Sequence, residues 1–469
     1  MRKKTVLGIT LGNMWSIKDY LLSGALKLLS EHFDIVCWVP ERFLEVTKQL
    51  GEKTGVTGIE FIKDPSAAPT KLSNLVYKFQ KSLIFERHDL ETERIMQRRS
   101  NRANAKYRSL LQNIISRIIR KIAKSPLFGF FDSELENIKR VITPSGIFSE
   151  DISKFNINMV FTTNPVVRAD DSLYFECLKR NIPVAALVLS WDNLTTRGII
   201  SKGFNKVMVW NELMRDEVLQ LYPSYEAGQI EITGFPRFDV YYRPLPPDFQ
   251  REIFLTSLGL NPKARIILLV SSSRLRFKTQ NQVFEHVCKA QEEGVFPNDV
   301  QVLIRCHPHD SISDYNQFRG RKNIVVWPDA KRGKGGSMFS QPPLLDELLI
   351  LAASVKYSAA CVSAGSTVCL DAAICDIPMI SIAYDGDIKL PFDDSVASCY
   401  NYSHQKPLHE LEATDLCYNR EELIYAIQSA LLDPKRKSTQ RKILVDKFLG
   451  NPGHSAEQIC KVLSGLEQS

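Results

Sequence analysis

Polar residues gather in the stretch "SWDNLTTRG", Ser190 to Gly198, directly after an apolar run. Asp192 in this stretch could accept a proton, and Arg197 could hold a phosphate group. The same stretch could instead form an Asx-type turn with a helix cap, built by Asp192, Asn193 or Thr195. Taken alone, the stretch leaves both interpretations open.

A second group of polar residues lies in the segment from Cys361 to Ile382, which predicts a strand, a turn of small residues and a helix. The turn contains Ser363, Gly365, Ser366 and Thr367. Backbone N–H groups and hydroxyls at the start of a helix suit an anionic phosphate group. The turn could also be a helix cap without a ligand.

Further candidates follow predicted strands elsewhere in the chain. His307 and Pro308 follow a strand in "LIRCHPHD", and Arg237 follows a strand and a Gly-Phe-Pro turn in "EITGFPRFDVY". His307 taken alone could be an ordinary loop histidine. In a doubly wound sheet, however, the loops at the carboxyl ends of the strands line the ligand crevice. The candidate ligand-binding residues are Arg197, Arg237, Ser272, His307, Pro308, Ser363, Gly365, Ser366, Thr367 and Asp371.

Short apolar runs, most of them continuous and β-branched, alternate with helical patterns along the chain. Such runs are typical of parallel strands that are covered on both faces, and their alternation with helices predicts doubly wound α/β domains. The expected strands are residues 5–11, 34–39, 158–162, 183–189, 206–210 and 230–233, and then 265–271, 300–306, 323–327, 359–363 and 378–383.

The stretch "YYRPLPPD", Tyr241 to Asp248, carries three prolines in a short polar run and predicts a linker. We therefore expect one Rossmann-like domain over residues 1–247 and a second over residues 248–469. Helices are expected from about Asn419 to the C-terminus.

Residues 94–124 contain ten Lys or Arg and no Asp or Glu, within a helical insertion expected over about 85–125. Leucines and isoleucines recur there at helical spacing between Leu110 and Ile122. The pattern is typical of a helix that lies on an anionic membrane surface. A helix that packs its apolar stripe on the first domain would show it too. The basic residues on the other faces of this helix are Arg117, Arg120, Lys121 and Lys124.

The chain of 469 residues has a net charge of +7, which favours acidic partners such as nucleotides and phosphorylated substrates. No apolar segment is long enough for a membrane span, and no cleavage site follows the N-terminal apolar run, so a cytoplasmic protein is expected. The ten cysteines form no CxxC pair and are expected to be buried free thiols. No metal is expected, and "YDGD", Tyr384 to Asp387, is interpreted as a ribose, sugar or loop contact.

The order of these motifs over residues 158–387 resembles that of the CDP-glycerol glycerophosphotransferases. The shared features are a polar loop after Trp that ends in Arg-Gly, a Gly-x-Pro-Arg-x-Asp motif, a strand that ends in His-Pro, and a serine-containing turn that opens a helix. More broadly, the order is similar to that of GT-B glycosyltransferases of bacterial surface polysaccharides. The His-Pro and serine-turn pair also resembles transferases that use CMP-sugars. The resemblance implies two Rossmann-like domains that face a central cleft.

The resemblance also implies roles for the candidate residues. The glycerophosphotransferases have a histidine as general base at the position of Asp192, and a carboxylate can take an acceptor proton in its place. The turn from Ser363 to Thr367 is closer to the Ser-x-Gly-Ser turn of sugar transferases. With His307, this turn is expected to hold the donor phosphate. If Asp192 is not the base, the next candidates are Asp170, Asp171 and Asp19.

We therefore expect a metal-independent glycosyltransferase of polysaccharide or glycolipid synthesis in the cell envelope. Its donor would be a UDP-, CDP- or CMP-linked sugar, and its acceptor a saccharide or a lipid-linked saccharide. It would need no separate cofactor, and residues 94–124 could attach it to the inner membrane face.

Three other functions remain open. The first is a CDP-glycerol-type glycerophosphotransferase, and the second is a sugar-nucleotide 2-epimerase, because these epimerases share the two-domain fold. The third is a non-catalytic protein that binds a membrane or nucleic acid through residues 94–124. That function leaves the His307 and Ser363 segments without a role, and no nucleic-acid partner is expected.

Overall fold

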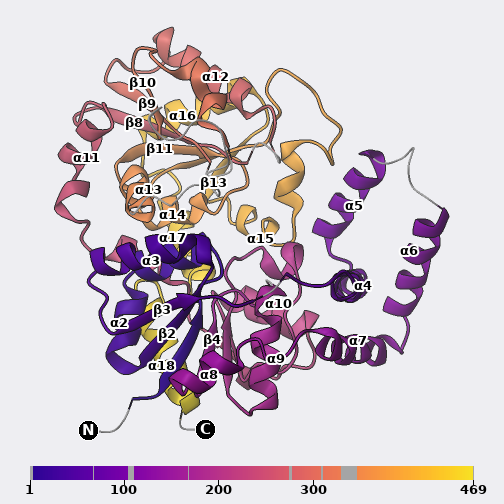
Figure 1. The fold of residues 1–469 in the computed structure, drawn as a ribbon. Coiled ribbons are helices and arrows are strands. Elements are labelled where there is room, and N and C mark those ends of the chain that lie inside the picture. The colour runs from indigo at the N-terminus through magenta and orange to yellow at the C-terminus, as the bar shows by residue number, and fades with distance from the viewer. Residues whose placement is uncertain are drawn as a thin grey trace. The chain divides into compact units, whose positions relative to one another are not determined.

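The computed structural model describes residues 4–66, 68–103, 110–166, 168–273, 277–307, 310–328 and 346–467. The chain divides into two compact units, the first formed by Met1–Asp239 with Leu449–Ser469 and the second by Val240–Phe448. Each unit contains one parallel β-sheet with helices packed against it (Figure 1). This arrangement confirms the expected α/β fold class.

The first unit contains a seven-stranded sheet in which all neighbouring strands are parallel. The strand order is β3-β2-β1-β4-β5-β6-β7, so the chain changes its direction of travel across the sheet between β1 and β4. The strands are β1 (Val6–Thr10), β2 (Asp34–Val39), β3 (Ile59–Lys63), β4 (Met159–Thr162), β5 (Val184–Leu187), β6 (Lys206–Val209) and β7 (Ile230–Ile232).

The second unit contains a six-stranded parallel sheet in the order β10-β9-β8-β11-β12-β13. Its change of direction lies between β8 and β11. The strands are β8 (Arg265–Val270), β9 (Val300–Arg305), β10 (Ile324–Trp327), β11 (Ser358–Ser363), β12 (Met379–Ile382) and β13 (Thr414–Cys417).

The apolar runs of the sequence form the centres of both sheets. In β8, for example, every residue after Arg265 is buried, because helices cover both faces of a parallel sheet. The eleven expected strands are all present, with ends that differ by at most two residues. Two further strands, β3 and β13, lie at sheet edges and are not predicted by the sequence. Both are partly exposed and contain charged residues, so neither reads as a continuous apolar run.

Helices connect the strands in both units. The first unit contains α1 (Met14–Leu22), α2 (Ala25–His32), α3 (Glu41–Lys53), α4 (Lys71–His88), α5 (Glu91–Ala103), α6 (Leu110–Ala123), α7 (Phe128–Ile142), α8 (Ser149–Phe155), α9 (Asp171–Lys179), α10 (Glu212–Leu221) and α18 (Ser455–Glu467). The second contains α11 (Arg251–Ser257), α12 (Gln280–Glu292), α13 (Glu347–Lys356), α14 (Val368–Ile374), α15 (Lys406–His409), α16 (Arg420–Leu432) and α17 (Ser438–Phe448).

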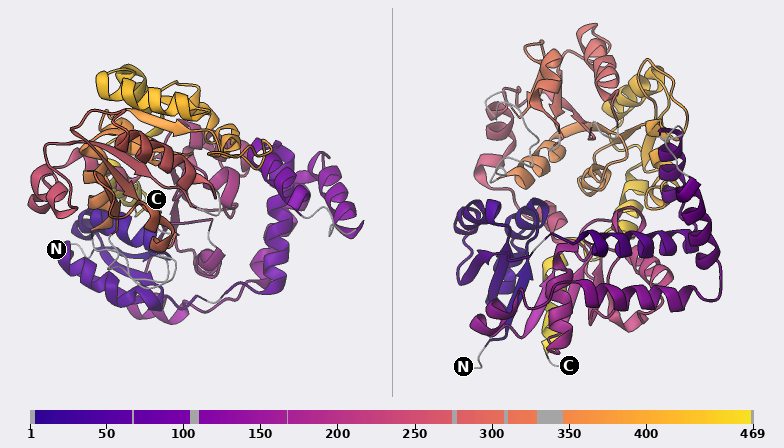
Figure 2. Two further views of the ribbon diagram at one scale, coloured as in Figure 1. Left: turned by 90° about the horizontal axis from the view of Figure 1, so that it is seen from above. Right: turned by 45° about the vertical axis from the view of Figure 1, so that its right-hand side comes forward.

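The basic segment belongs to a helical insertion formed by α4 to α7. Helices α4 and α7 lie side by side, as the right-hand view of Figure 2 shows. The packing interpretation of α6 holds only in part. Ala123 is buried, but Ile114, Ile115 and Ile118 are 44%, 42% and 47% exposed. Within the described ranges, no helix is both long and apolar enough to cross a membrane.

The C-terminal segment differs from the expected division of the chain. We expected residues 248–469 to form the second domain, but Leu449–Ser469 packs with the first unit. The backbone N–H of Gly450 donates to the carbonyl of Trp210 at 2.8 Å. The buried carboxylate of Asp239 accepts from the N–H groups of Ser455 and Ala456, at 3.2 and 3.0 Å. Asp239 therefore satisfies the free donors at the start of α18.

Replacing Asp239 with Ala should lower the free energy of unfolding of the first unit by about 1–2 kcal/mol, because two buried backbone N–H groups lose their acceptor. Urea denaturation followed by circular dichroism measures the change. Asp248→Ala removes an exposed carboxylate and should leave the transition unchanged. Equal stability of the two variants would contradict the capping role.

Candidate functional site

The second sheet brings three of the candidate loops to one place. Ser272 follows β8, His307 follows β9, and the turn from Ser363 to Thr367 follows β11. These strands are neighbours in the order β9-β8-β11, and the sheet changes direction between β8 and β11. Ligands of open α/β sheets bind outside the carboxyl ends of the strands at this kind of switch point.

The loop after β8 contacts the turn after β11 directly. The Ser272 hydroxyl donates to the carbonyl oxygen of Ala364 at 2.7 Å. The side-chain amide of Gln280, on α12, holds the Ser272 backbone from both sides: Oε1 accepts its N–H at 2.9 Å and Nε2 donates to its carbonyl at 2.8 Å. Ser272 is thus fixed at the switch point.

The turn after β11 depends on a glycine. Gly365 has a φ of 52°, in the left-handed region, and an added Cβ would lie 2.6 Å from Cys399 Sγ. The amide of Gln405 donates to the Gly365 carbonyl at 3.1 Å. Ser363 is fully buried, and no hydrogen-bond partner is found for its hydroxyl oxygen among the described residues. Ser366 and Thr367, by contrast, are half-buried and border the turn before α14.

The other candidates of the second unit differ in exposure. His307 is half-buried, and its carbonyl accepts the N–H of Asp310 at 2.9 Å. Pro308 lies outside the described residues. Asp371, on α14, is fully buried and accepts the Tyr241 hydroxyl at 2.6 Å. Asp371, which we predicted as a ligand contact, therefore holds Tyr241 within the second unit.

A cavity of about 680 Å³ lies at the carboxyl ends of β12 and β13, beside the "YDGD" stretch. His286 Nδ1 lies 3.0 Å from the Tyr384 hydroxyl, and its Nε2 lies 3.0 Å from Asp387 Oδ1. The stretch therefore belongs to a hydrogen-bonded cavity wall. In the part of the chain that the structure describes, no cluster of three or more His, Cys, Asp or Glu is placed to hold a metal ion. All ten cysteines are free thiols, as expected.

In the first unit, Asp192 follows β5 and directly precedes a π-helical turn over Asn193–Arg197. Its side chain accepts hydrogen bonds from the Ser190 hydroxyl at 2.7 Å, from the Thr196 hydroxyl at 3.2 Å and from Arg197 Nε at 3.2 Å. Asp192 itself does not cap the turn, because its side chain accepts none of the turn's backbone N–H groups. Asp192 is 8% exposed, and a substrate hydroxyl would have to share its oxygens with these donors.

The structure adds a carboxyl group that the sequence analysis missed. Glu217, on α10, has its Oε2 buried, and no hydrogen-bond partner is found for this atom in the described structure. Burial, together with the nearby charge of Asp192, raises the pKa of Glu217 to about 8. Glu217 is therefore protonated at neutral pH and could exchange a proton beside Asp192. Nothing in the sequence indicates this pair, because Glu217 occurs in an ordinary charged helix.

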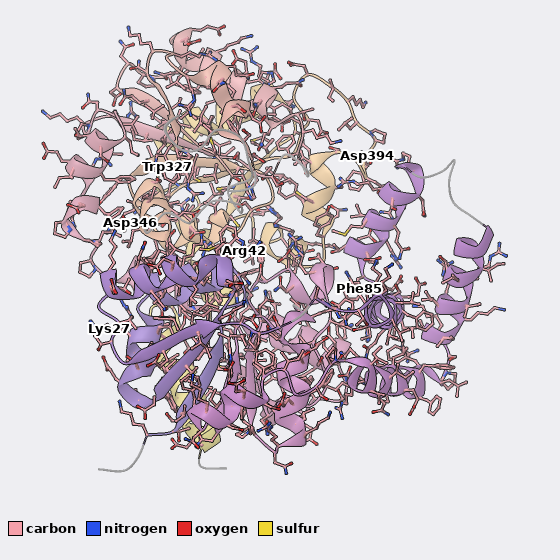
Figure 3. The ribbon with its side chains drawn as sticks, in the orientation of Figure 1. Lys27, Arg42, Phe85, Trp327, Asp346 and Asp394 are labelled. Carbon is pink, nitrogen blue, oxygen red and sulfur yellow. The ribbon has the colours of Figure 1, made fainter. Side chains whose placement is uncertain are left out.

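Helix α4 of the insertion supports the Asp192 loop. Lys81 Nζ donates to the carbonyl of Thr196 at 3.0 Å, and the Tyr77 hydroxyl accepts the N–H of Ile199 at 3.1 Å. A side chain at Gly198 would collide with the Tyr77 hydroxyl, which explains the glycine that ends the stretch. Figure 3 labels Phe85 on α4, and Lys81 Nζ lies 4.9 Å from the centroid of its ring.

The two candidate arginines of the first unit are placed differently. The Arg197 side chain is 63% exposed and pairs with Asp192. Arg237 lies in the 3₁₀ helix Pro236–Tyr242, is half-buried, and stacks over the Phe238 ring with Cζ 4.7 Å from its centroid. Arg197 thus retains an open guanidinium for an anionic ligand.

Among solved structures, the chain is similar over nearly its whole length to sugar-nucleotide enzymes. The match to a UDP-GlcNAc 2-epimerase from Methanocaldococcus jannaschii covers 98% of this chain and 100% of that one, at 14% identity and a TM-score of 0.54. For a UDP-GlcNAc 2-epimerase from Neisseria meningitidis bound to UDP-GlcNAc, the shares are 99% and 100%, the identity 9% and the TM-score 0.53. The match to the glycotransferase of kitacinnamycin covers 98% of this chain and 99% of that one, at 9% identity and a TM-score of 0.52.

The fold is GT-B-like. At 9–14% identity, the likeness concerns the fold and leaves the reaction to the residues of the sites. No protein-family model matches the chain, and no curated protein does.

Proposed function

We propose that the protein is a nucleotide-sugar-dependent enzyme, and specifically a glycosyltransferase. The observation that carries the proposal is the convergence of Ser272, His307 and the Ser363–Thr367 turn at the switch point of the second sheet. Hydroxyls, a histidine and backbone N–H groups in a tight turn are suited to the phosphates of a nucleotide. The GT-B-like solved structures include an epimerase with UDP-GlcNAc bound, which supports a nucleotide-sugar as the ligand.

In the proposed reaction, an acceptor hydroxyl attacks the anomeric carbon of the donor sugar, and the bond from that carbon to the nucleotide phosphate breaks. The leaving phosphate takes the bonding electrons, and His307 and the turn stabilise its charge. Asp192 accepts the proton of the hydroxyl. The second unit thus binds the donor, and the first unit supplies the base.

We further propose that the donor carries a UDP, CDP or CMP group, and that the acceptor is a saccharide or a lipid-linked saccharide in cell-envelope synthesis on the cytoplasmic side. We also propose that the reaction needs no metal ion. These assignments follow from the motif order described above, and a nucleotide panel tests the first of them.

Wild-type protein should be stabilised against heat by at least one of UDP, CDP, CMP and their sugars, because a ligand that binds the native state raises the melting temperature. His307→Ala should weaken the best of these nucleotides by about 10- to 100-fold, as expected for a lost hydrogen bond to a charged group. Titration calorimetry measures the affinity.

His454 is an exposed histidine directly before α18. His454→Ala is a matched control that should bind the nucleotide normally. Unchanged affinity of His307→Ala would remove His307 from the site. Failure of every nucleotide to bind the wild-type protein would overturn the proposed function itself.

Asp192→Asn should reduce turnover by about 10²- to 10⁴-fold, because Asn keeps the size of the side chain but cannot accept the proton. Nucleotide affinity should remain, because the proposed donor site lies in the other unit. Steady-state kinetics and calorimetry on the same variant separate the two effects. Near-normal turnover would show that the base is elsewhere.

The second candidate function is 2-epimerisation of a nucleotide-sugar. The pair of Asp192 with protonated Glu217 favours it, because epimerisation moves protons on and off the sugar. Incubation of UDP-GlcNAc with the enzyme alone distinguishes the two: an epimerase converts the nucleotide-sugar without an acceptor, whereas a transferase releases the nucleotide only when an acceptor takes the sugar.

We propose that α6 attaches the protein to an anionic membrane surface. Its exposed Ile114, Ile115 and Ile118 form an apolar patch, and Arg117 beside them is exposed too. Apolar side chains next to basic ones are the composition of interfacial helices. Arg120 pairs with Glu86 at 2.9 Å but remains 66% exposed.

Changing Arg117, Arg120, Lys121 and Lys124 to Gln should reduce pelleting with phosphatidylserine-containing vesicles, since each basic residue near the surface contributes about 1 kcal/mol. The matched control changes four exposed lysines elsewhere in the first unit and removes the same charge. These are Lys48, Lys154, Lys179 and Lys461. Equal loss in both variants, or a wild-type protein that never pellets at low salt, would contradict the attachment.

A further inference from the structure

The first sheet has its own switch point, between β1 and β4. Thr10 and Thr162 end these two strands and are paired in the register of the sheet. Their hydroxyls lie 3.3 Å apart. The chain thus places two hydroxyls side by side at the edge where open α/β sheets bind ligands.

Both hydroxyls donate to one oxygen of Asp170. Thr10 Oγ1 lies 2.7 Å and Thr162 Oγ1 2.6 Å from Asp170 Oδ2. The other oxygen, Oδ1, lies beside Gly12: an added Cβ there would be 3.8 Å from it, at an ordinary van der Waals distance. Asp170 therefore has Oδ2 fixed by two threonine hydroxyls, while Oδ1 lies beside the backbone of Gly12.

Asn164 supplies a second polar group at the same place. It follows Thr162 by two residues, and its backbone N–H lies 3.4 Å from Thr162 Oγ1. Its side chain is 7% exposed, and its Oδ1 is buried with no hydrogen-bond partner among the described residues. A buried acceptor without a donor destabilises the protein unless a ligand or an ordered water satisfies it.

Burial makes Asp170 hold its proton more tightly than an exposed carboxyl group does. Burial raises the pKa of Asp170 to about 7, the two threonine hydroxyls lower it, and the negative charges of Asp64 and Asp171 raise it. Arg168 is the nearby cation, with Nε 3.5 Å from Asp171 Oδ2. Asp170 is therefore largely protonated below pH 7 and largely ionised above it.

We propose that Asp170 and Asn164 form a saccharide-binding site at the first switch point, in which each accepts a hydrogen bond from a hydroxyl group of the sugar. The inference rests on the proposed function, since it assigns this site to the acceptor. Two acceptor oxygens, both beyond the carboxyl ends of β1 and β4, suit a ligand with neighbouring hydroxyl groups. The ionised carboxylate accepts the stronger bond, so sugar affinity increases as the pH rises through about 7.

The test is saturation-transfer NMR on the full chain, saturated with the nucleotide that binds best. The probes are N-acetylglucosamine, glucose, galactose and mannose, each titrated at pH 6 and pH 8. At least one sugar should bind the wild-type protein, and more tightly at pH 8. Asp170→Asn should weaken it by about tenfold at pH 8 and remove the pH dependence, and Asn164→Ala should weaken it at both pH values.

Asp64→Asn is the matched control, because it removes a neighbouring charge and not a proposed contact. It should retain sugar binding, with the pH midpoint moved to lower pH. Equal sugar affinity of the wild type, Asp170→Asn and Asn164→Ala would overturn the site, with melting curves confirming that the variants are folded. A wild-type protein that binds nucleotide but none of the sugars would also overturn it, and would leave the proposed function standing.

Discussion

Neighbouring strands in both sheets are hydrogen-bonded in parallel, so every loop that follows a strand leaves its sheet at the same edge. Residues far apart in the sequence meet there. In the second unit, this brings the end of β8 next to the end of β11, where Ser272 contacts Ala364 across 92 residues of chain. In the first unit, it brings Thr10 next to Thr162, where one carboxylate binds both. In each unit, the proposed chemistry depends on the loops that meet at the carboxyl ends of the strands.

The helical insertion contributes to that edge as well as to the protein surface. Helix α4 binds the Asp192 loop through Lys81 and Tyr77. It also binds the turn before Asp170, because Arg168 donates to the side chains of Ser73 and Asn74. One helix therefore orients the loops of two carboxylates, and its neighbour α6 carries the exposed isoleucines. A change in the insertion would reach both loops through these few hydrogen bonds.

The sequence was informative where a residue's neighbours along the chain decide its structure. Continuous apolar runs predicted the central strands, and the polar residues after them predicted the Asp192, His307 and Ser363 loops. It was uninformative where the structure depends on contacts between distant segments. The Asp170 site needs the register of Thr10 with Thr162, 152 residues apart. Likewise, nothing near Glu217 or Leu449 indicates that α10 packs beside Asp192 or that α18 returns to the first unit.

The return of α18 bears on how the protein is made. Trp210 and Gly450 are joined by a backbone hydrogen bond, and the whole second unit lies between them in the chain. A ribosome therefore synthesises all of that unit before the first unit receives its last helix. Until then the Asp239 carboxylate has no α18 to cap, and β6 and β7 lack the segment that covers Trp210. The first unit begins folding first and is completed last, so the nascent chain exposes this surface throughout synthesis of the second unit.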